Sequence, residues 1–323
     1  MKRREFSLAA AAAVLAQAMP ARAADYPSRP VRLIVPYPPG GGTDTVARAV
    51  FERVSTLARQ PFVVDNKAGA GTSIGLAELA RSHPDGYTVG VGGSSDPLLP
   101  FLYDKLPFNP TADLTFVATL ATVPIVLAAG PSLPARTMGE LLAIGRAKGA
   151  KPMDYASPGI ASPHHLAGIY LGEMARIPLA HVPYKGTSQA MTDLIGGHVP
   201  LAMLGLPSAL SFARQGKLKI LGVASKQRSA LAPDVPTISE GGVAGFDAGY
   251  WWHVTVPTGT PKPVIETLRQ AINKALDMPD LRESLLKSGF EPMQMPEAEA
   301  EKALKADTAK WAKVIRDNHI HGM

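Results

Sequence analysis

The sequence predicts an α/β protein with two lobes, and three observations support this prediction. Short apolar runs alternate with stretches of helical periodicity between residues 31 and 223, a pattern typical of mostly parallel sheets. The chain has 323 residues, which is enough for two domains. Two extended segments, Thr119–Ala129 and Tyr250–Thr255, separate the α/β blocks, so we expect the chain to cross between the lobes there.

The first lobe begins with strands and helices in alternation. Val46, Val50, Val54 and Leu57 recur at helical spacing and predict one buried helix face. In chain order, the expected elements of this part are the strand Val31–Val35, the helix Thr43–Ala58, the strand Phe62–Val64, the helix Thr72–Ala80 and the strand Tyr87–Val91.

The same alternation continues in the middle of the chain and predicts the second lobe. The expected strands there are Ile125–Ala128, Asp154–Ala156, His181–Val182, Leu201–Leu204 and Leu218–Val223. The expected helices between them are Thr137–Ala147, Ser162–Glu173, Gln189–Ile195 and Ser208–Gln215.

The C-terminal part is helical rather than alternating. Apolar residues recur at helical spacing after Pro261, and two further helical stretches follow. We expect these helices to complete the first lobe, which would then be discontinuous in sequence. The predicted division is residues 24–124 with 248–323 for the first lobe and residues 125–247 for the second.

The first 23 residues read MKRREFSLAAAAAVLAQAMPARA, with a basic start, an apolar middle and a small-residue end. This is the pattern of a secretory signal peptide. Arg3–Leu8 resembles a twin-arginine signal, but Ser7 stands where leucine is preferred, so twin-arginine and general export both stay open. The apolar stretch is too short for a membrane anchor. We therefore predict a periplasmic protein that is soluble after signal cleavage.

Composition excludes several classes of function. The sequence has no cysteine, which rules out disulfides, cysteine nucleophiles, thiolate metal sites and a lipoprotein anchor. The formal charge of +6 becomes +3 without residues 1–23, because that segment holds four basic residues and one acidic residue. The excess is scattered and gives no support to nucleic-acid binding. We find no metal-ligand spacing and predict neither a metal nor a cofactor.

The segment Pro36–Asp44, PYPPGGGTD, joins a strand to a helix, and we call it the first helix-start loop. Its prolines end the strand, and Gly40–Gly42 let the backbone approach a ligand closely. Thr43 or Asp44 is expected to cap the helix. The first N–H groups of a helix lack internal partners and carry partial positive charge, so the loop suits an anion.

A carboxylate is the anion that this loop favours. The phosphate-binding pattern G-x-x-x-x-G-K-[S/T] is absent, because no lysine follows the glycines, and G-x-G-x-x-G is absent as well. The alternative is that the glycines only make a tight turn between strand and helix.

A second loop of similar design favours the binding interpretation. Ser157–His165, SPGIASPHH, again joins a strand to a helix, and we call it the second helix-start loop. Ser162 is a good N-cap, and Pro163 suits the first helical position because its missing N–H costs nothing there. Since ligands of open α/β sheets bind beyond the carboxyl ends of strands, the two loops are expected to face each other across a cleft.

Two further strand-to-helix loops are weaker candidates. His181–Ala190 contains Tyr184 and Lys185, of which the lysine is expected to be an ordinary solvated side chain. Asn66–Gly75 is rich in glycine and either lines the cleft or lets helix and sheet pack closely; we favour packing.

Catalytic chemistry has one sequence candidate. Gly71–Gly75 matches the nucleophile-elbow pattern G-x-S-x-G with Ser73 as nucleophile, but the expected strand ends near Val64, too early for that motif. His164 and His165 are adjacent on a helix and point about 100° apart, so they cannot chelate one metal well. A secreted serine hydrolase is therefore the alternative function, and not the favoured one.

Several motifs resemble those of a known receptor family. They are YPSRPVRLIVPYPPGGGTDTVAR, FVVDNKAGAGTSIG, PDGYTVG, YASPGIASPHHLAG, HVPYKG, PDVPTISEGG and VPTGTPKPVI, in that order. They resemble the extracytoplasmic solute receptors of the tripartite tricarboxylate transporters, the Bug family. The resemblance covers nearly the whole mature chain.

The resemblance implies a two-lobed periplasmic binding protein of the Venus flytrap type, with the ligand in the cleft between the lobes. It implies a monomer that hands a small organic carboxylate to membrane permease subunits, with no enzymatic activity. It also implies that both helix-start loops clamp the carboxylate, largely through backbone N–H groups and waters. The expected ligand-binding residues are Tyr37, Pro39, Gly40, Gly41, Gly42, Thr43, Asp44, Ser94, Ser95, Ser157, Gly159, Ala161, Ser162, His165 and Tyr184.

The sequence departs from the family pattern in two places. Ile160–Pro163 is stiffer and more apolar than the family's second loop. Asp96 stands where the family has an uncharged stretch; we favour a helix-capping role, because Asp-Pro is a good helix start, over a carboxylate that faces the cleft and attracts an ammonium group. A sensor subunit for a membrane signalling partner would have the same binding site and stays open.

Overall fold

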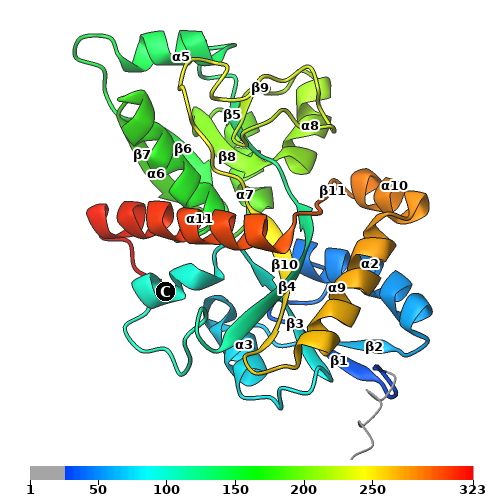
Figure 1. Cartoon of the computed structure of the whole chain (residues 1–323). Helices are drawn as coiled ribbons and strands as arrows, with labels where there is room; N and C mark the ends of the chain where they lie inside the picture. Colours follow the sequence, from blue (N-terminus) through cyan, green and yellow to red (C-terminus); the bar gives the residue numbers. More distant parts are fainter. Residues whose placement is uncertain (1–25, 323) are drawn as a thin grey trace, which may run out of the picture.

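The computed structural model describes residues 26–322 and has two lobes, each built around one β-sheet (Figure 1). The α/β class and the two-lobed architecture are therefore confirmed. The predicted signal peptide, residues 1–23, lies outside the described residues. Across residues 26–322, no helix has both the length and the apolar character that crossing a membrane requires.

The first sheet has six strands in the order β11-β4-β10-β3-β1-β2. Their bounds are Val31–Val35 for β1, Phe62–Asn66 for β2, Thr88–Gly93 for β3, Leu114–Thr122 for β4, Trp251–Pro257 for β10 and Glu291–Pro292 for β11. β1 pairs in parallel with β2 and β3, whereas β10 and β11 pair antiparallel with their neighbours.

Helices cover both faces of the first sheet, because successive residues of a strand point to opposite faces. Trp251 belongs to a cluster with residues of α11, and Trp252, its neighbour on β10, packs in the main core with α2 and α9. The helices of this lobe are α2 (Gly42–Ala58), α3 (Ser73–Ala80), α4 (Leu99–Leu102), α9 (Lys262–Leu276), α10 (Pro279–Lys287) and α11 (Glu297–Asp317), with short helices η1 (Ala70–Thr72) and η2 (Asp96–Leu98).

The second sheet has five strands in the order β7-β6-β8-β5-β9. Their bounds are Ile125–Ala129 for β5, Met153–Ser157 for β6, Leu179–Pro183 for β7, Leu201–Gly205 for β8 and Lys219–Val223 for β9. The helices are α5 (Met138–Gly145), α6 (Pro163–Ala175), α7 (Thr187–Ile195) and α8 (Leu206–Arg214). Met203 of β8 packs with α5 and α6, and Leu204 packs with α7 and α8, so this sheet is also covered on both faces.

The prediction of mostly parallel sheets is wrong, because both sheets are mixed. β5 runs antiparallel to β8 and β9, and β10 runs antiparallel to β3 and β4. The physical reason is the crossing of the chain between lobes. A strand that follows a helix on the same sheet returns in parallel. β5 instead follows directly on β4 of the other sheet, with only Val123 and Pro124 between them. It therefore enters the second sheet antiparallel to its neighbours β8 and β9.

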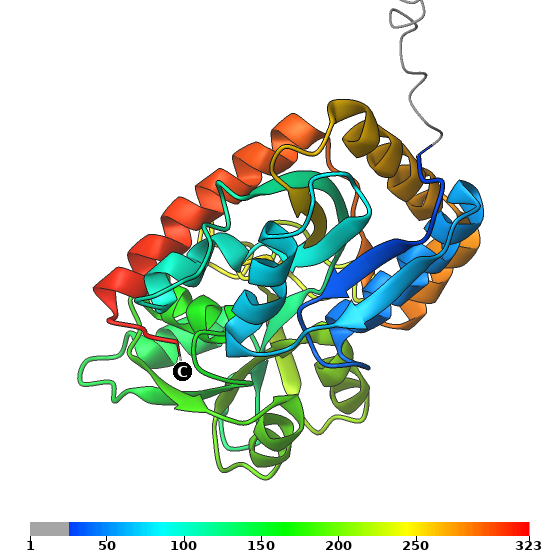
Figure 2. The same ribbon diagram turned by 90° about the horizontal axis from the view of Figure 1, so that it is seen from below.

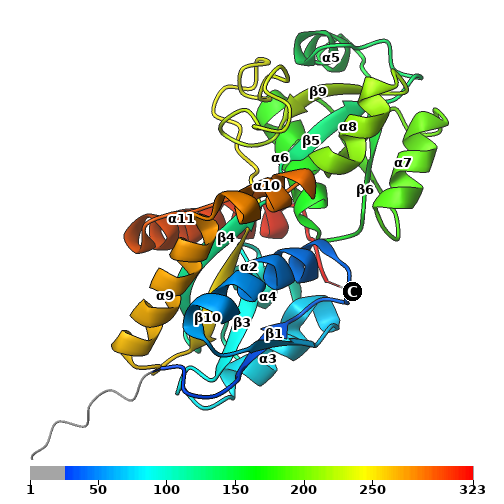
Figure 3. The ribbon, with the colours of Figure 1, turned by 90° about the vertical axis from the view of Figure 1, so that its right-hand side faces the viewer.

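α11 spans the boundary between the lobes along one side of the molecule (Figures 1 and 2). Its Trp311 packs edge-on against Tyr170 of α6, with ring centroids 5.5 Å apart. Lys310 Nζ donates to the Asp247 carbonyl at 2.9 Å. Figure 3 shows the two lobes in profile, with α10 and α11 at the level where they meet. The lobe limits at residues 124/125 and 247/248 stay a prediction.

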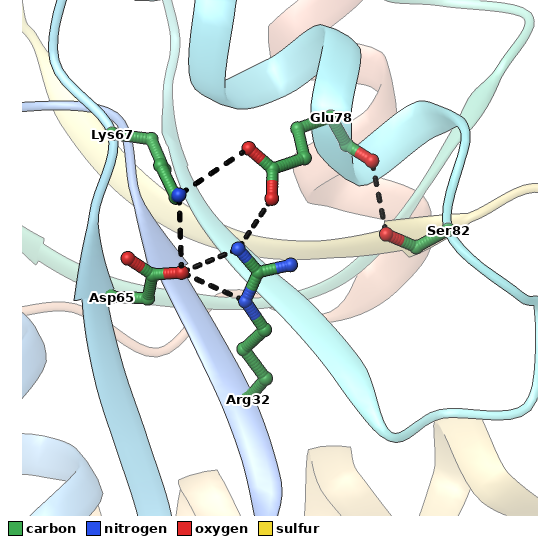
Figure 4. Close-up of polar contacts among 5 residues, drawn as sticks. All are labelled: Arg32, Asp65, Lys67, Glu78 and Ser82. Atoms are coloured by element: carbon green, nitrogen blue, oxygen red, sulfur yellow. Dashed lines mark hydrogen bonds and ion pairs between the residues drawn. The ribbon is translucent and has the colours of Figure 1, made fainter.

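A network of four charged side chains ties β1, β2 and α3 together (Figure 4). Arg32 donates to Asp65 through Nε at 2.8 Å and also contacts Glu78. Lys67 Nζ lies 3.7 Å from Asp65 and 3.8 Å from Glu78. These side chains are about one-third exposed, so their pairing contributes little stability but fixes geometry. The network holds the loop after β2 in place.

Candidate functional site

A cleft of about 590 Å³, which we call the central cleft, lies where loops of the two lobes meet. The first lobe lines it with Tyr37 and with residues of the loop after β2 and of the segment after β3. The second lobe lines it with Ile160–Pro163. Four predicted site residues reach its wall: Tyr37, Ser95, Ala161 and Ser162. The predicted meeting of the two helix-start loops is therefore seen in this part of each loop.

The first helix-start loop begins α2 without a side-chain cap. The N-cap residue is Gly41, so the prediction that Thr43 or Asp44 caps the helix is wrong. Asp44 lies one turn later and reaches back, because its Oδ2 accepts from the Gly40 N–H at 2.9 Å. Gly40 has φ +78°, a backbone conformation that glycine adopts at no steric cost.

Asp44 is buried and is the centre of a polar cluster. It accepts from Arg48 Nε at 2.9 Å and from Asn66 Nδ2 at 2.9 Å. Burial opposes its ionisation, but the hydrogen bonds from Arg48, Gly40 and Asn66 outweigh that effect and lower the pKa of the carboxyl. Asn66 also donates to the Tyr37 carbonyl at 3.0 Å, so the cluster fixes the loop.

The start of α2 keeps free hydrogen-bond donors. Among residues 26–322, the backbone N–H groups of Gly42, Thr43 and Asp44 have no acceptor. Gly42 is exposed, whereas Thr43 and Asp44 are buried. The helix dipole adds partial positive charge at this end. The geometry suits an anion that approaches the backbone.

The second helix-start loop is capped as the sequence predicts. Ser162 is the N-cap of α6, its Oγ accepts from the His165 N–H at 3.2 Å, and Pro163 is the first helical residue. Ala161 has φ +58°, which is unusual for a residue with a side chain. Its N–H donates to His165 Nδ1 at 3.1 Å, which holds the strained conformation. The N–H groups of Ile160 and His164 find no acceptor among residues 26–322.

The stacked imidazole rings of His165 and His181 support this loop. The rings of His165 and His181 lie 3.7 Å apart at their centroids, at an angle of 19°. His181 Nε2 is 2.7 Å from Ser157 Oγ, and Ser157 is fully buried. Burial lowers the pKa of both histidines to about 4, and for His165 the neighbouring His181 adds to the effect. Ser157 and His165 hold the conformation of the loop through these contacts. Neither residue is among those that line the central cleft.

His181 contacts the second helix-start loop and is a residue that sequence reasoning missed. It lies on β7, which pairs with β6 so that His181 stands beside Tyr155. The motif HVPYKG contains it, but only the pairing of the two strands brings it under the second helix-start loop. No signal in the sequence fixes that register.

Asp96 lies at the floor of the central cleft and is not a helix cap. The short helix η2 begins at Asp96, its N-cap is Ser95, and no side chain caps it, so the capping prediction is wrong. The Asp96 carboxylate accepts from the Gly93 N–H at 2.8 Å and from the Thr72 hydroxyl. Burial raises the pKa of Asp96 to about 7, against the lowering effect of these bonds.

Tyr37 lines the central cleft, and Tyr250, which is not part of the lining, lies next to it. Tyr37 and Tyr250 have hydroxyl groups 3.4 Å apart, and burial followed by the charge of Asp96 raises the pKa of Tyr250. Tyr250 was not predicted as a site residue. It precedes β10, one of the crossing segments, and a polar aromatic residue at a lobe crossing is the only signal that could have found it.

The remaining predicted residues lie elsewhere. Pro39 and Gly40 are exposed beside the cleft, and Gly159 is half-buried. Ser94 is buried, and its Oγ accepts from the Trp251 N–H at 3.3 Å. The Tyr184 hydroxyl donates to Asp193 at 2.7 Å, so its hydrogen is used inside the second lobe and is not offered to a ligand.

The loop after β2 lines the central cleft through Gly69, Gly71 and Thr72, so our preference for a packing role alone is wrong. Packing still holds at Gly75, where a Cβ atom would come within 2.9 Å of Pro36. Ser73 begins α3 seven residues after β2 ends at Asn66, and this is not the strand-to-helix turn of a nucleophile elbow. Within residues 26–322, no cluster of three or more acidic residues, histidines or cysteines could hold a metal.

Comparison with known proteins identifies the family. Residues 46–320 match the model of the tripartite tricarboxylate transporter family receptor. The structure is similar to that of the periplasmic binding protein BugD, with 32% identity and a TM-score of 0.73 over 92% of this chain and 100% of that one. The resemblance drawn from the sequence motifs is thereby confirmed.

Two similar structures contain a bound carboxylate. An R. palustris protein solved with adipate is 29% identical, with a TM-score of 0.76 over 92% of this chain and 100% of that one. MatC from Rhodopseudomonas palustris, solved with bound malate, is 30% identical, with a TM-score of 0.72 over 90% and 100% of the two chains. Because the family model matches most of its length, this chain belongs to the receptors of the tripartite tricarboxylate transporter family, which are binding proteins and not enzymes.

Proposed function

We propose that this protein is a periplasmic receptor that captures a small organic carboxylate in the central cleft and delivers it to the permease subunits of a tripartite tricarboxylate transporter. One observation carries the proposal. Both helix-start loops line the same cleft, through Pro36–Pro38 and through Ile160–Pro163, and each leads to a helix start with free backbone N–H groups. A helix start binds an anion without a cationic side chain.

The lining of the cleft supports a carboxylate held by the backbone. The residues that line it, all within the described chain, include no lysine, arginine or histidine. The one acidic residue, Asp96, has a pKa raised to about 7 by burial, so below that pH its neutral carboxyl group can donate a hydrogen bond. This favours a carboxylate ligand over the ammonium ligand that an ionised Asp96 would attract.

The carbon skeleton of the ligand is inferred to be apolar. Leu98, Leu99 and Leu102 line one wall of the cleft, and Ile160 lines the other with a side chain left 39% exposed. The exposed side chain of Ile160 gains from burial against an apolar ligand, whereas Leu98 and Leu99 are already buried, at 1% and 4% exposed. The solved relatives contain adipate and malate, which are both dicarboxylates.

The mechanism we infer is closure of two lobes on the ligand. The lobes are residues 24–124 with 248–323 and residues 125–247, and the protein acts as a monomer after its signal peptide is removed. Closure occurs only if the ligand binds the closed arrangement more tightly than the open one. A carboxylate that reaches both helix-start loops meets that condition.

A thermal-shift screen tests this proposal. The panel contains adipate, malate, citrate and benzoate, with 1,6-hexanediol and 1,6-diaminohexane as controls that match adipate in length. We expect at least one carboxylate to raise the melting temperature, because binding to the folded state stabilises it, and neither control to do so. Stabilisation by the diamine or the diol, with none by any carboxylate, would overturn the proposal.

A further inference from the structure

A second cavity of about 810 Å³ lies under α11, and we call it the α11 cavity. β10 and β4 form its floor, α11 forms its roof, and the segments around Pro97 and Pro110 form its sides. It shares Asp96 with the central cleft, but its lining includes no residue of either helix-start loop, both of which the structure describes in full. The α11 cavity is therefore a separate space of the size that holds a small ligand.

The cavity exists because α11 presents small side chains to the sheet there. Thr308, Ala309 and Ala312 line it, whereas Trp311 and Ile315, on another face of the same helix, are buried in the main core. A helix placed over a sheet with only small residues between them leaves unfilled volume, which natural cores avoid. Small residues alone do not make a binding site, so the polar groups of the floor decide the question.

Two buried polar atoms on the floor have no hydrogen-bond partner among residues 26–322. They are Nδ1 of His253 and Oγ1 of Thr255, in side chains that are 5% and 3% exposed. The two residues are two positions apart on β10 and therefore share one face of the sheet. Both line the α11 cavity. Buried polar atoms in proteins are nearly always hydrogen-bonded, so two such atoms beside one cavity indicate a partner that is not part of the chain.

The mouth of the cavity is cationic. Lys305 and Arg316 line it and are exposed, and neither forms an ion pair with a carboxylate of residues 26–322. Glu301 is the one exposed acidic residue beside them. The middle of the cavity is lined by apolar side chains, among them Phe116 of β4 and Leu304 of α11. The cavity thus has a hydrogen-bonding inner end, an apolar middle and a positive outer end.

We propose that the α11 cavity is a second ligand site, which binds an aromatic acid with a hydroxyl group at the end opposite its carboxylate. The hydroxyl group lies against His253 and Thr255, because a phenol both donates and accepts a hydrogen bond. The ring packs between Phe116 and Leu304, and the carboxylate lies near Lys305 and Arg316. This ligand satisfies all three parts of the cavity at once.

Titration calorimetry with 4-hydroxycinnamate tests the proposal. Cinnamate lacks the hydroxyl group, and 4-hydroxycinnamyl alcohol lacks the carboxylate, so each control removes one end of the ligand. We expect 4-hydroxycinnamate to bind about fivefold to tenfold more tightly than cinnamate, because the hydroxyl adds a hydrogen bond to otherwise unpaired groups. Absence of binding by 4-hydroxycinnamate to the wild-type protein would overturn the proposal.

Three variants assign the binding to the α11 cavity. Ala309→Trp places an indole at an exposed position of the cavity wall and is expected to abolish binding of 4-hydroxycinnamate. Thr255→Val keeps the shape of the side chain and is expected to weaken 4-hydroxycinnamate binding about fivefold to tenfold. Its melting temperature should stay equal or rise, because an unpaired buried hydroxyl is removed. Gly41→Val, in the first helix-start loop, is expected to leave the binding unchanged.

The opposite pattern contradicts the second site. If 4-hydroxycinnamate binding is lost in Gly41→Val and kept in Ala309→Trp, the acid binds in the central cleft alone. Failure of the central-cleft proposal gives a different result, because then neither adipate nor malate binds while 4-hydroxycinnamate binding still depends on Thr255 and Ala309.

Discussion

The two helix-start loops both line the central cleft but are stabilised by different chemistry. The first is built on glycine, and its conformation depends on the ionised carboxylate of Asp44, which binds Gly40, Arg48 and Asn66. The second contains no charged group in its network. Neutral hydroxyl and imidazole groups hold it, through the contact of Ser157 with His181 and the bond from Ala161 to His165.

Because of this difference, we expect the two loops to lose stability under different conditions. The pKa of Asp44 is lowered, so the first loop keeps its stabilising charge until the solution becomes acidic enough to protonate that carboxyl. The pKa values of His165 and His181 are lowered to about 4, so the second loop is at its most stable when both rings are neutral. Between pH 6.5 and pH 4, only the second loop is expected to weaken.

The largest expected effect comes from a substitution that blocks ligand access to the first helix-start loop. Gly41→Val should reduce carboxylate affinity more than 100-fold, because the side chain blocks approach to the N–H groups at the start of α2. The fold should survive, since Gly41 has φ −74° and a Cβ atom there meets nothing closer than the Pro38 carbonyl at 3.4 Å. Calorimetry with the best ligand from the screen measures the effect.

Gly139→Val is the matched control for that variant. Gly139 also lies near the start of a helix, α5, and a Cβ atom there meets nothing closer than 3.9 Å. The control should bind the ligand with wild-type affinity. If Gly41→Val binds as well as the control, the first helix-start loop is only a turn.

A smaller effect is expected from breaking the support of the second loop. Ser157→Ala removes the hydroxyl group beside His181 and leaves a half-buried imidazole nitrogen without that partner. We expect a loss of about 1–3 kcal/mol in the free energy of unfolding and less than tenfold in ligand affinity. Urea unfolding and calorimetry on the same sample separate the two quantities. A loss of affinity as large as that of Gly41→Val would mean that the serine contacts the ligand directly.

The pH dependence of stability sharpens the comparison further. A buried neutral histidine binds fewer protons in the folded state than in the unfolded state between pH 4 and pH 6.5, so stability falls as the pH falls through that range. For His165 and His181 we expect a loss of roughly 1–2 kcal/mol each between pH 7 and pH 5. The double variant His165→Asn/His181→Gln keeps hydrogen-bonding atoms near Nδ1 and Nε2 and should make the curve less steep. The slope that remains comes from His164 and His253, because burial lowers the pKa of both to about 4 as well. An unchanged curve would place the titrating groups elsewhere.

Asp96 gives the smallest expected effect, in a third pH range. Its pKa is raised to about 7, so the carboxyl ionises between pH 6 and pH 8 and then repels a bound carboxylate. Affinity should fall about threefold to tenfold over that range in the wild-type protein. Asp96→Asn should remove the dependence while it keeps an oxygen acceptor for the Gly93 N–H. A rise of affinity with pH would instead indicate an ammonium group on the ligand.

The sequence predicted those features that depend only on residues close together in the chain. The cap at Ser162 and the proline at position 163 follow from backbone donors that need a partner, and both are found. The caps at Thr43, Asp44 and Asp96 are wrong, and the side chains of Asp44 and Asp96 bind other partners instead. Asn66 and Arg48 hold Asp44, and Thr72 helps to hold Asp96.

Contacts that depend on strand pairing could not be predicted. The stacking of His165 on His181 requires β7 to lie beside β6 in one register, and the hydrophobic pattern of two short strands does not select it. The antiparallel direction of β5 in the second sheet likewise could not be predicted, because it results from the chain arriving from β4 in the first lobe. The same holds for Tyr250, which comes near Tyr37 only because β10 returns to the first sheet.

The central claim is that one carboxylate ligand contacts both helix-start loops at once. A crystal structure of the protein with adipate, or with the carboxylate that stabilises it most, tests this claim most directly. The account predicts a ligand oxygen within hydrogen-bond distance of the Gly42 or Thr43 N–H, and another oxygen, or a bridging water, at the Ile160 or His164 N–H. A ligand bound to one lobe alone, or with its carboxylate on an arginine or lysine side chain, would contradict it.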